Sequence, residues 1–100
     1  MQKLVELSKI FSDKNRLKIL GLIQREKRVC VCEICDTLAL SQPLVSRHLK
    51  VMKMAGVVDA RKEKQWIHYS LVENPHSLLQ VVLETLQKES LPKLVVCAVK

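Results

Sequence analysis

Residues 41–56 read SQPLVSRHLKVMKMAG, and this stretch has the pattern of a single helix with defined ends. Ser41 is a good N-cap residue, and Pro43 falls in the first turn, where a missing N–H costs little. Gly56 is well placed to end the helix, because glycine readily adopts the left-handed conformation that follows many helices. We therefore predict a helix that begins near Ser41 and ends before Gly56.

The two faces of this helix differ in chemistry, since residues three and four apart lie on the same side. Val45, Leu49 and Met52 form an apolar stripe that predicts the buried face. The opposite face carries the residues that suit the major groove of DNA, namely Gln42, Ser46, Arg47, Lys50 and Lys53. Gln can pair with adenine, Arg with guanine and Ser with base or phosphate, while Lys is better suited to phosphates. His48 lies between the faces and is interpreted as a packing residue or a DNA contact. An ordinary solvated helix face is the alternative interpretation.

Elements on both sides of this helix complete a winged helix-turn-helix. A short helix is expected over residues 33–38, and a break of three to four residues between two such helices is the helix-turn-helix pattern. From residue 57 to residue 71 the hydrophobic period changes to two, which predicts a β-hairpin. The basic residues of this hairpin are Arg61, Lys62 and Lys64, all suited to phosphates. A basic hairpin in this position is a wing.

Three further segments have helical periodicity. The first covers residues 2–11. The second is capped by Ser12 or Asp13 and runs to about residue 24. The last starts at Asn74-Pro75, a capping side chain followed by proline, and runs to about residue 89. A brief extended segment is expected over residues 29–31.

The last helix has a wide apolar band for so small a domain. We therefore predict a two-fold dimer face built from residues 2–11 and 75–89. The tail after Pro92 is compatible with a loose end or with a return onto the domain. The expected fold class is mainly α with a small β-hairpin wing: a homodimeric winged helix-turn-helix in one domain over residues 1–100.

Length and charge limit the function further. One hundred residues make one small domain, and the net charge of +7 favours a polyanionic partner such as nucleic acid. No segment approaches the ~18 apolar residues that span a bilayer, and the N-terminus has no signal-peptide core. We therefore expect a cytoplasmic protein with no membrane partner. Its four cysteines are then expected to be ligands or redox groups rather than structural disulfides.

Three of the cysteines, Cys30, Cys32 and Cys35, fall within six residues, directly before the helix-turn-helix. Cys32 and Cys35 can meet on one face of a helix, whereas Cys30 would lie on the far side of a continuous helix. One ion can bind all three sulfurs only if Cys30 lies in an extended lead-in or if the first helical turn unwinds. Because this segment braces the recognition helix, we predict that an ion bound here weakens DNA binding.

The number of sulfurs narrows the choice of ion, since thiolates select soft metals. Zinc in a closed structural site usually takes four ligands, whereas three thiolates satisfy a pyramidal As(III) or Sb(III) centre. We predict a site for As(III) or Sb(III) at Cys30, Cys32 and Cys35, with no organic cofactor. Cys97 is a conceivable fourth ligand whose position the sequence leaves open. The alternatives are three small apolar core residues and a C-x-x-C redox motif, although the βαβ unit typical of that motif is missing.

The span from residue 30 to residue 71 resembles the ArsR/SmtB family of winged-helix metalloregulatory repressors. CVCEIC (30–35) is similar to the motif ELCVCDLC of the arsenic-sensing branch, SQPLVSRHL (41–49) to the recognition helix and WIHYSL (66–71) to the second wing strand. Arg28-Val29 replaces the Glu-Leu of that motif and Glu33 its Asp, and neither change removes a sulfur. The last helix has only His76 and lacks the Asp-x-His pattern of the family's zinc sensors. The N-terminus lacks the cysteines of its cadmium and lead sensors.

This resemblance implies a homodimeric repressor of an arsenic-resistance operon, not an enzyme. The free dimer is expected to bind a palindromic operator in double-stranded DNA and to leave it when As(III) or Sb(III) binds the three cysteines. Two alternatives keep the DNA-binding module: a thiol redox or persulfide sensor, and a sensor of cadmium, lead or zinc. A thiol oxidoreductase is the alternative from another class, and the basic helix-turn-helix argues against it.

Overall fold

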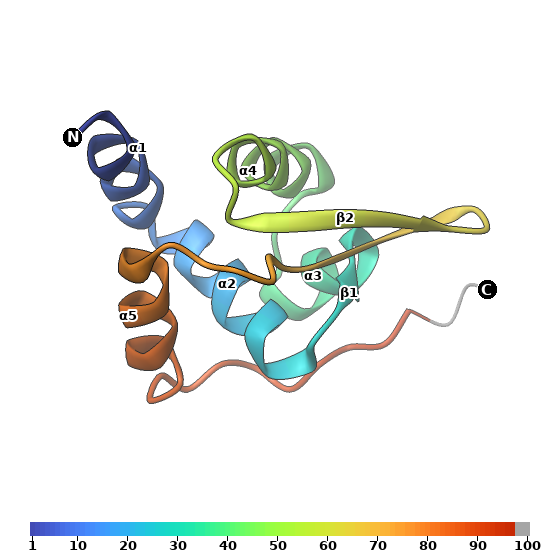
Figure 1. The fold of residues 1–100 in the computed structure, drawn as a ribbon. Coiled ribbons are helices and arrows are strands. Elements are labelled where there is room, and N and C mark those ends of the chain that lie inside the picture. Colours follow the sequence, from blue (N-terminus) through green and yellow to red (C-terminus); the bar gives the residue numbers. More distant parts are fainter. Residues whose placement is uncertain (98–100) are drawn as a thin grey trace.

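The computed structural model describes residues 1–97, which form a helical domain with a small sheet extending from one side (Figure 1). The elements follow in the order α1 (Gln2–Phe11), α2 (Lys14–Glu26), β1 (Val29–Cys30), α3 (Val31–Leu38), α4 (Gln42–Met54), β2 (Val58–Glu63), β3 (Trp66–Leu71) and α5 (Ser77–Leu86). α3 and α4 are the helix-turn-helix pair, and β2 and β3 form the long wing. The predicted fold class is confirmed.

The recognition helix α4 has the expected ends and the expected buried face. Ser41 Oγ accepts a hydrogen bond from the N–H of Leu44 at 3.4 Å. Gly56 has φ +76° just beyond the last turn. The inward stripe has no solvent exposure: Val45, Leu49 and Met52. This stripe packs into the single core shared with α1, α2 and α5.

The wing is tied to the segment that carries the cysteines. Strand β3 pairs antiparallel with β2 on one edge and with β1 on the other. The β1 register places Val29 opposite Tyr69 and Cys30 opposite His68. A ladder of only two residues therefore holds Cys30 in an extended conformation immediately before α3 begins.

Two helix starts differ from the predictions, and a side-chain cap explains each one. α3 starts at Val31, two residues earlier than expected, because the Glu33 carboxylate accepts the N–H of Cys30 at 3.1 Å. The last helix starts at Ser77, after Asn74-Pro75, because His76 Nδ1 accepts the N–H of Leu78 at 3.0 Å. It ends at Leu86, before the predicted limit at residue 89.

The chain after α5 returns onto the domain, which settles the question of the tail for the described residues. We name residues 87–97 the C-terminal strap. It passes along α2 and reaches α3 (Figure 1). Arg25 donates hydrogen bonds to the carbonyls of Leu91 and Pro92 at 3.2 and 2.7 Å, and the N–H of Val95 donates to Thr37 Oγ1 at 2.8 Å. Residues 98–100, the end of the predicted domain, lie outside the described part.

The predicted dimer face has the composition of an interface. α1 and α5 contact each other, and between them they expose Leu4, Val5 and Val81 at 46%, 47% and 58%. Apolar side chains exposed together mark interaction sites more often than isolated ones do. Within residues 1–97, none of the helices has the length and apolar character that a membrane crossing requires.

Replacement of Leu49 by alanine tests the anchoring of α4. Removing a fully buried leucine side chain leaves a cavity, so Leu49→Ala should lower the free energy of unfolding by about 2–5 kcal/mol. Met54, on the same helix, is 79% exposed, and Met54→Ala should change the free energy of unfolding by less than about 0.5 kcal/mol. Urea unfolding followed by circular dichroism measures both. Equal effects from the two substitutions would contradict the packing described.

Candidate metal centre and nucleic-acid interface

The three predicted ligands lie at the junction of β1 and α3. Cys30 is the last residue of β1 and the N-cap of α3, with φ −96° and ψ 165°, and its side chain is 3% exposed. Cys32 and Cys35 follow on the first two turns of α3. Of the two conditions that allow one ion to bind all three sulfurs, the first holds: Cys30 lies in an extended lead-in. The regular part of α3 therefore does not have to unwind to bring Cys30 into the group.

The three cysteines line one hollow between α3, the wing and the start of α4. Its volume is about 540 Å³, and its wall includes Gln42 from α4 and Trp66 from β3. The environment favours the neutral thiol of Cys35: burial, the nearby Asp36 carboxylate and Cys30 all raise the pKa of that thiol. The hollow brings the cysteines next to residues of both DNA-reading elements.

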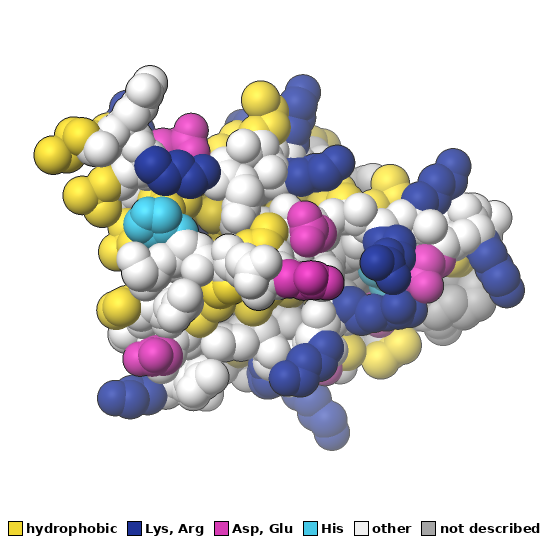
Figure 2. Space-filling model, viewed as in Figure 1, with side chains coloured by type: hydrophobic (Ala, Val, Ile, Leu, Met, Phe, Trp, Pro, Cys, Tyr) yellow, Lys and Arg dark blue, Asp and Glu magenta, His cyan; other side chains and the backbone are white. Residues whose placement is uncertain are grey.

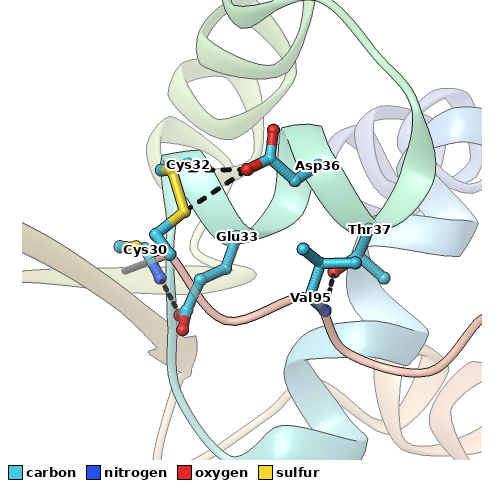
Figure 3. Close-up of a disulfide and its surroundings, with 7 residues drawn as sticks. Cys30, Cys32, Glu33, Asp36, Thr37 and Val95 are labelled. Atoms are coloured by element: carbon cyan, nitrogen blue, oxygen red, sulfur yellow. Dashed lines mark hydrogen bonds between the residues drawn. A yellow bond between two sulfur atoms is a disulfide. The ribbon is translucent and has the colours of Figure 1, made fainter. Parts of the chain in front are cut away.

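Besides its place beside Cys30 and Cys35, Cys32 has a partner that the sequence did not reveal. It forms a disulfide with Cys97 at the end of the C-terminal strap, with 6.3 Å between the two Cα atoms (Figure 3). Asp36 Oδ2 lies 3.7 Å from Cys32 Sγ and 3.6 Å from Cys97 Sγ. Cys30 and Cys35 are free thiols. The expectation of ligands or redox groups rather than structural disulfides did not identify this pair, because the strap brings together two residues that are 65 positions apart.

This second cluster has ligand character of its own. The donor atoms of Cys32, Asp36 and Cys97 all lie within 4.8 Å of one another. Two thiolates and a carboxylate are ligands that soft or borderline divalent cations accept. When the disulfide is reduced, Cys32 can therefore serve either of two donor sets.

The predicted DNA-contacting residues lie on the exposed faces of α4 and the wing, with one exception. The exposed ones are Gln42, Ser46, Arg47, Lys50, Lys53, Arg61, Lys62 and Lys64. Lys and Arg side chains gather over α4 and along the wing (Figure 2). Phosphate contacts require this exposure of positive charge, so the surface suits a nucleic-acid backbone.

His48 is the exception, because its side chain is buried. The residue is 6% exposed, and its Nδ1 accepts a hydrogen bond from Arg16 Nε at 3.0 Å. Its Nε2 lies 3.9 Å from Asp13 Oδ1, the carboxylate that caps α2. The structure thus places His48 in the packing between α2 and α4, and a direct DNA contact does not fit this position. Periodicity left the choice open, since His48 lies at the border of the two faces.

A polar contact that sequence reasoning missed links the wing to the β1 lead-in. Glu63 Oε1 lies 2.9 Å from Arg28 Nη2 and 3.0 Å from His68 Nδ1. Arg28 precedes β1 by one residue, and Glu63 is the last residue of β2. The alternating pattern of the hairpin predicted its strands but gave no signal for this contact, which depends on the β1–β3 pairing.

Comparison with known sequences gives three informative relatives. Residues 13–60 match the sequence model described as "Bacterial regulatory protein, arsR family". The chain is 44% identical to an uncharacterized HTH-type transcriptional regulator of Methanocaldococcus jannaschii, over 73% of this chain and 82% of the relative. It is 40% identical to the arsenical resistance operon repressor of Escherichia coli, over 72% and 60%. It is 41% identical to the cadmium resistance transcriptional regulatory protein CadC of Listeria innocua, over 61% and 51%. The chain therefore spans less than two thirds of the length of the two metal-resistance relatives.

A solved structure has the same architecture. HlyU from Vibrio cholerae superimposes with a TM-score of 0.74 and is 31% identical, over 87% of this chain and 90% of that protein. The similarity extends well beyond the helix-turn-helix pair.

The buried position of His48 predicts a pH dependence of stability. Burial lowers the pKa of the imidazole; the Asp13 carboxylate opposes this shift, and Arg16 and Arg47 reinforce it. As the pH falls below about 6.5, the imidazole of His48 takes up a proton in the unfolded chain but not in the folded chain. Acidification through this range therefore lowers the free energy of unfolding. Urea unfolding at pH 7.5 and 5.5 should show a smaller loss for His48→Gln than for the wild type. An unchanged loss in His48→Gln would refute the assignment.

Proposed function

The chain belongs to the arsR family of regulatory proteins, and on that premise we propose that it is a homodimeric repressor that arsenite or antimonite releases from operator DNA. Members of this family are DNA-binding transcriptional regulators rather than enzymes, so the thiol oxidoreductase is excluded. The observation that supports the inducer is the hollow shared by Cys30, Cys32, Cys35 and Gln42. An effector bound to these sulfurs lies against the first residue of the recognition helix.

The donor set fits a trivalent pnictogen when Cys32 is reduced. Three thiols condense with arsenous acid to form three As–S bonds and three water molecules, with no net release of protons. Thiolates are the ligands that such soft centres select. The extended backbone at Cys30 supports this fit, because it frees that sulfur from the geometry of the helix.

The route from this site to DNA is short. α3 packs against α4, and β1 pairs with β3 of the wing. Drawing three sulfurs together shifts the start of α3 relative to both neighbours. Such coupling between two sites is typically worth 1–3 kcal/mol, or about 5- to 150-fold in affinity. A repressor needs a change of this size to leave its operator.

On DNA, α4 is the proposed reader and the wing the proposed clamp. We expect Gln42, Ser46 and Arg47 to reach base edges, and the lysines of α4 and the basic residues of the wing to contact phosphates. The exposed apolar residues of α1 and α5 support a two-fold dimer. Its half-sites should then lie about 10 base pairs apart or a multiple of that.

The Cys32–Cys97 proximity favours a second candidate inducer, a soft divalent cation such as Cd²⁺. With both cysteines reduced, Cys97 and Asp36 add donors that a tetrahedral centre needs. Divalent cations displace thiol protons, so their affinity rises with pH. Arsenite affinity does not share this dependence, because its condensation with neutral thiols releases water.

The inducer is tested with reduced protein on operator DNA selected in vitro from a random duplex pool. Stoichiometric arsenite should lower the affinity for this DNA by about tenfold or more. Cys32→Ser removes one of the three sulfurs and should remain bound to DNA, whereas Cys97→Ala should respond as the wild type does. Gel shifts with and without arsenite measure this.

The same titration with Cd²⁺ separates the two inducers. If Cd²⁺ releases the wild type more effectively than arsenite, and Cys97→Ala abolishes that release, the divalent cation is the inducer. An operator affinity that arsenite leaves unchanged in the fully reduced protein would falsify the arsenite proposal.

The salt dependence of operator binding tests the phosphate contacts. If about six phosphates are neutralised per dimer, the slope of log K against log salt should be near −5. Lys62→Ala removes two contacts per dimer and should make this slope shallower by about 2. Lys88, exposed beyond α5, is the matched control, and Lys88→Ala should leave the slope unchanged. Fluorescence anisotropy between about 50 and 200 mM salt measures the slope. Equal slopes for wild type and Lys62→Ala would rule out a phosphate contact by the wing.

A further inference from the structure

We propose that Cys32 and Cys97 form a reversible redox couple that decides whether the three-thiol site can bind its inducer. In the disulfide, Cys32 is unavailable, and only Cys30 and Cys35 remain as thiols. Reduction restores the third sulfur. The consequence for arsenite rests on the proposed function, whereas the disulfide itself can be tested without it.

The C-terminal strap is positioned by contacts that do not depend on the disulfide. Arg25 holds the carbonyls of Leu91 and Pro92, and Thr37 Oγ1 accepts the N–H of Val95 two residues before Cys97. The Leu91 side chain packs closely over Gly21. A Cβ atom at position 21 would lie 2.8 Å from Cδ1 of Leu91. After reduction these contacts keep the two thiols near each other. Their effective concentration stays high, which favours the return of the disulfide.

The exposure of the two sulfurs differs in a way that suits a redox couple. Cys97 is 4% exposed, while Cys32 is partly accessible at the start of α3. An external oxidant or reductant therefore meets Cys32 first. In the reduced state, a protonated thiol of either cysteine can donate a hydrogen bond to Asp36 Oδ2. The same carboxylate oxygen of Asp36 is thus within reach of both sulfurs (Figure 3).

The chemistry is balanced with a peroxide as oxidant. The Cys32 thiolate attacks the peroxide, the O–O bond breaks, and Cys32 becomes a sulfenic acid while an alcohol or water leaves. The Cys97 thiol then displaces water from that sulfenic acid and forms the S–S bond. Two electrons and two protons pass from the two thiols to the peroxide. A dithiol reverses the step by thiol–disulfide exchange.

The oxidised protein is expected to keep its DNA-reading surface. In the structure with the disulfide formed, α4 is packed on the core and the wing is paired with β1. Oxidation therefore leaves operator binding in place but removes one of the three bonds that arsenite forms. The result is a repressor that no longer responds to arsenite until it is reduced.

Thiol counting tests the couple directly. The full chain is treated with a small excess of hydrogen peroxide, labelled with a maleimide and weighed by mass spectrometry. Reduced wild type should carry four labels and oxidised wild type two, and peptide mapping should place the disulfide at Cys32–Cys97. Cys32→Ser and Cys32→Ala, prepared in parallel and checked for folding by circular dichroism, lack the sulfur that attacks the peroxide and should retain all three remaining thiols. Four labels after oxidation, or a disulfide between other cysteines, would overturn the couple.

Arsenite binding and operator gel shifts test the consequence. Oxidised wild type should hold the operator and bind arsenite about tenfold or more weakly than reduced wild type. Dithiothreitol, added to the oxidised wild type, should restore the arsenite affinity of the reduced protein. Equal arsenite affinity in the two wild-type forms, or operator release by peroxide alone, would overturn the gating proposal. If reduced wild type fails to bind arsenite, the proposed function fails, and the mapped disulfide still decides whether the couple exists.

Discussion

The pairing of β1 with β3 is the constraint on which the site depends. Two residues, Val29 and Cys30, add to the edge of the wing and stop the helix from starting earlier. Without this pairing, Cys30 would continue the coil of α3 and point away from Cys32 and Cys35. With it, the three cysteines face one hollow that also touches the first residue of the recognition helix. This short ladder joins the cysteine segment to the wing, and the packing of α3 on α4 joins the same segment to the recognition helix.

The sulfur of Cys32 belongs to two possible donor sets. One donor set lies within the β1–α3 segment, and the other joins α3 to the C-terminal strap through Cys97 and Asp36. Both sets need the same sulfur, so they exclude each other. The chain is similar to relatives that have arsenical and cadmium resistance in their names. The position of the strap therefore decides which second donor set Cys32 can join.

Local rules predicted most of the fold. The apolar stripe of Val45, Leu49 and Met52 identified α4 and its buried face, and the change to a period of two identified the wing. The errors at helix starts arise where one side chain decides between two nearby boundaries. Glu33 caps α3 and His76 caps α5, and neither choice is visible in periodicity. His48 was ambiguous for a related reason: a residue at the border of two faces becomes buried only because Arg16 of another helix meets it.

The sequence by itself determined the elements, the basic reading face and the presence of three thiols in six residues, because these follow from spacing along a chain of known geometry. Only the tertiary structure decided which sulfurs meet. Cys97 reaches Cys32 across 65 residues through the course of the strap, which contacts with Arg25, Gly21 and Thr37 fix one by one. Such contacts join residues far apart in the chain, so no local pattern records them. The set of donors that meets at Cys32 is therefore a property of the folded domain.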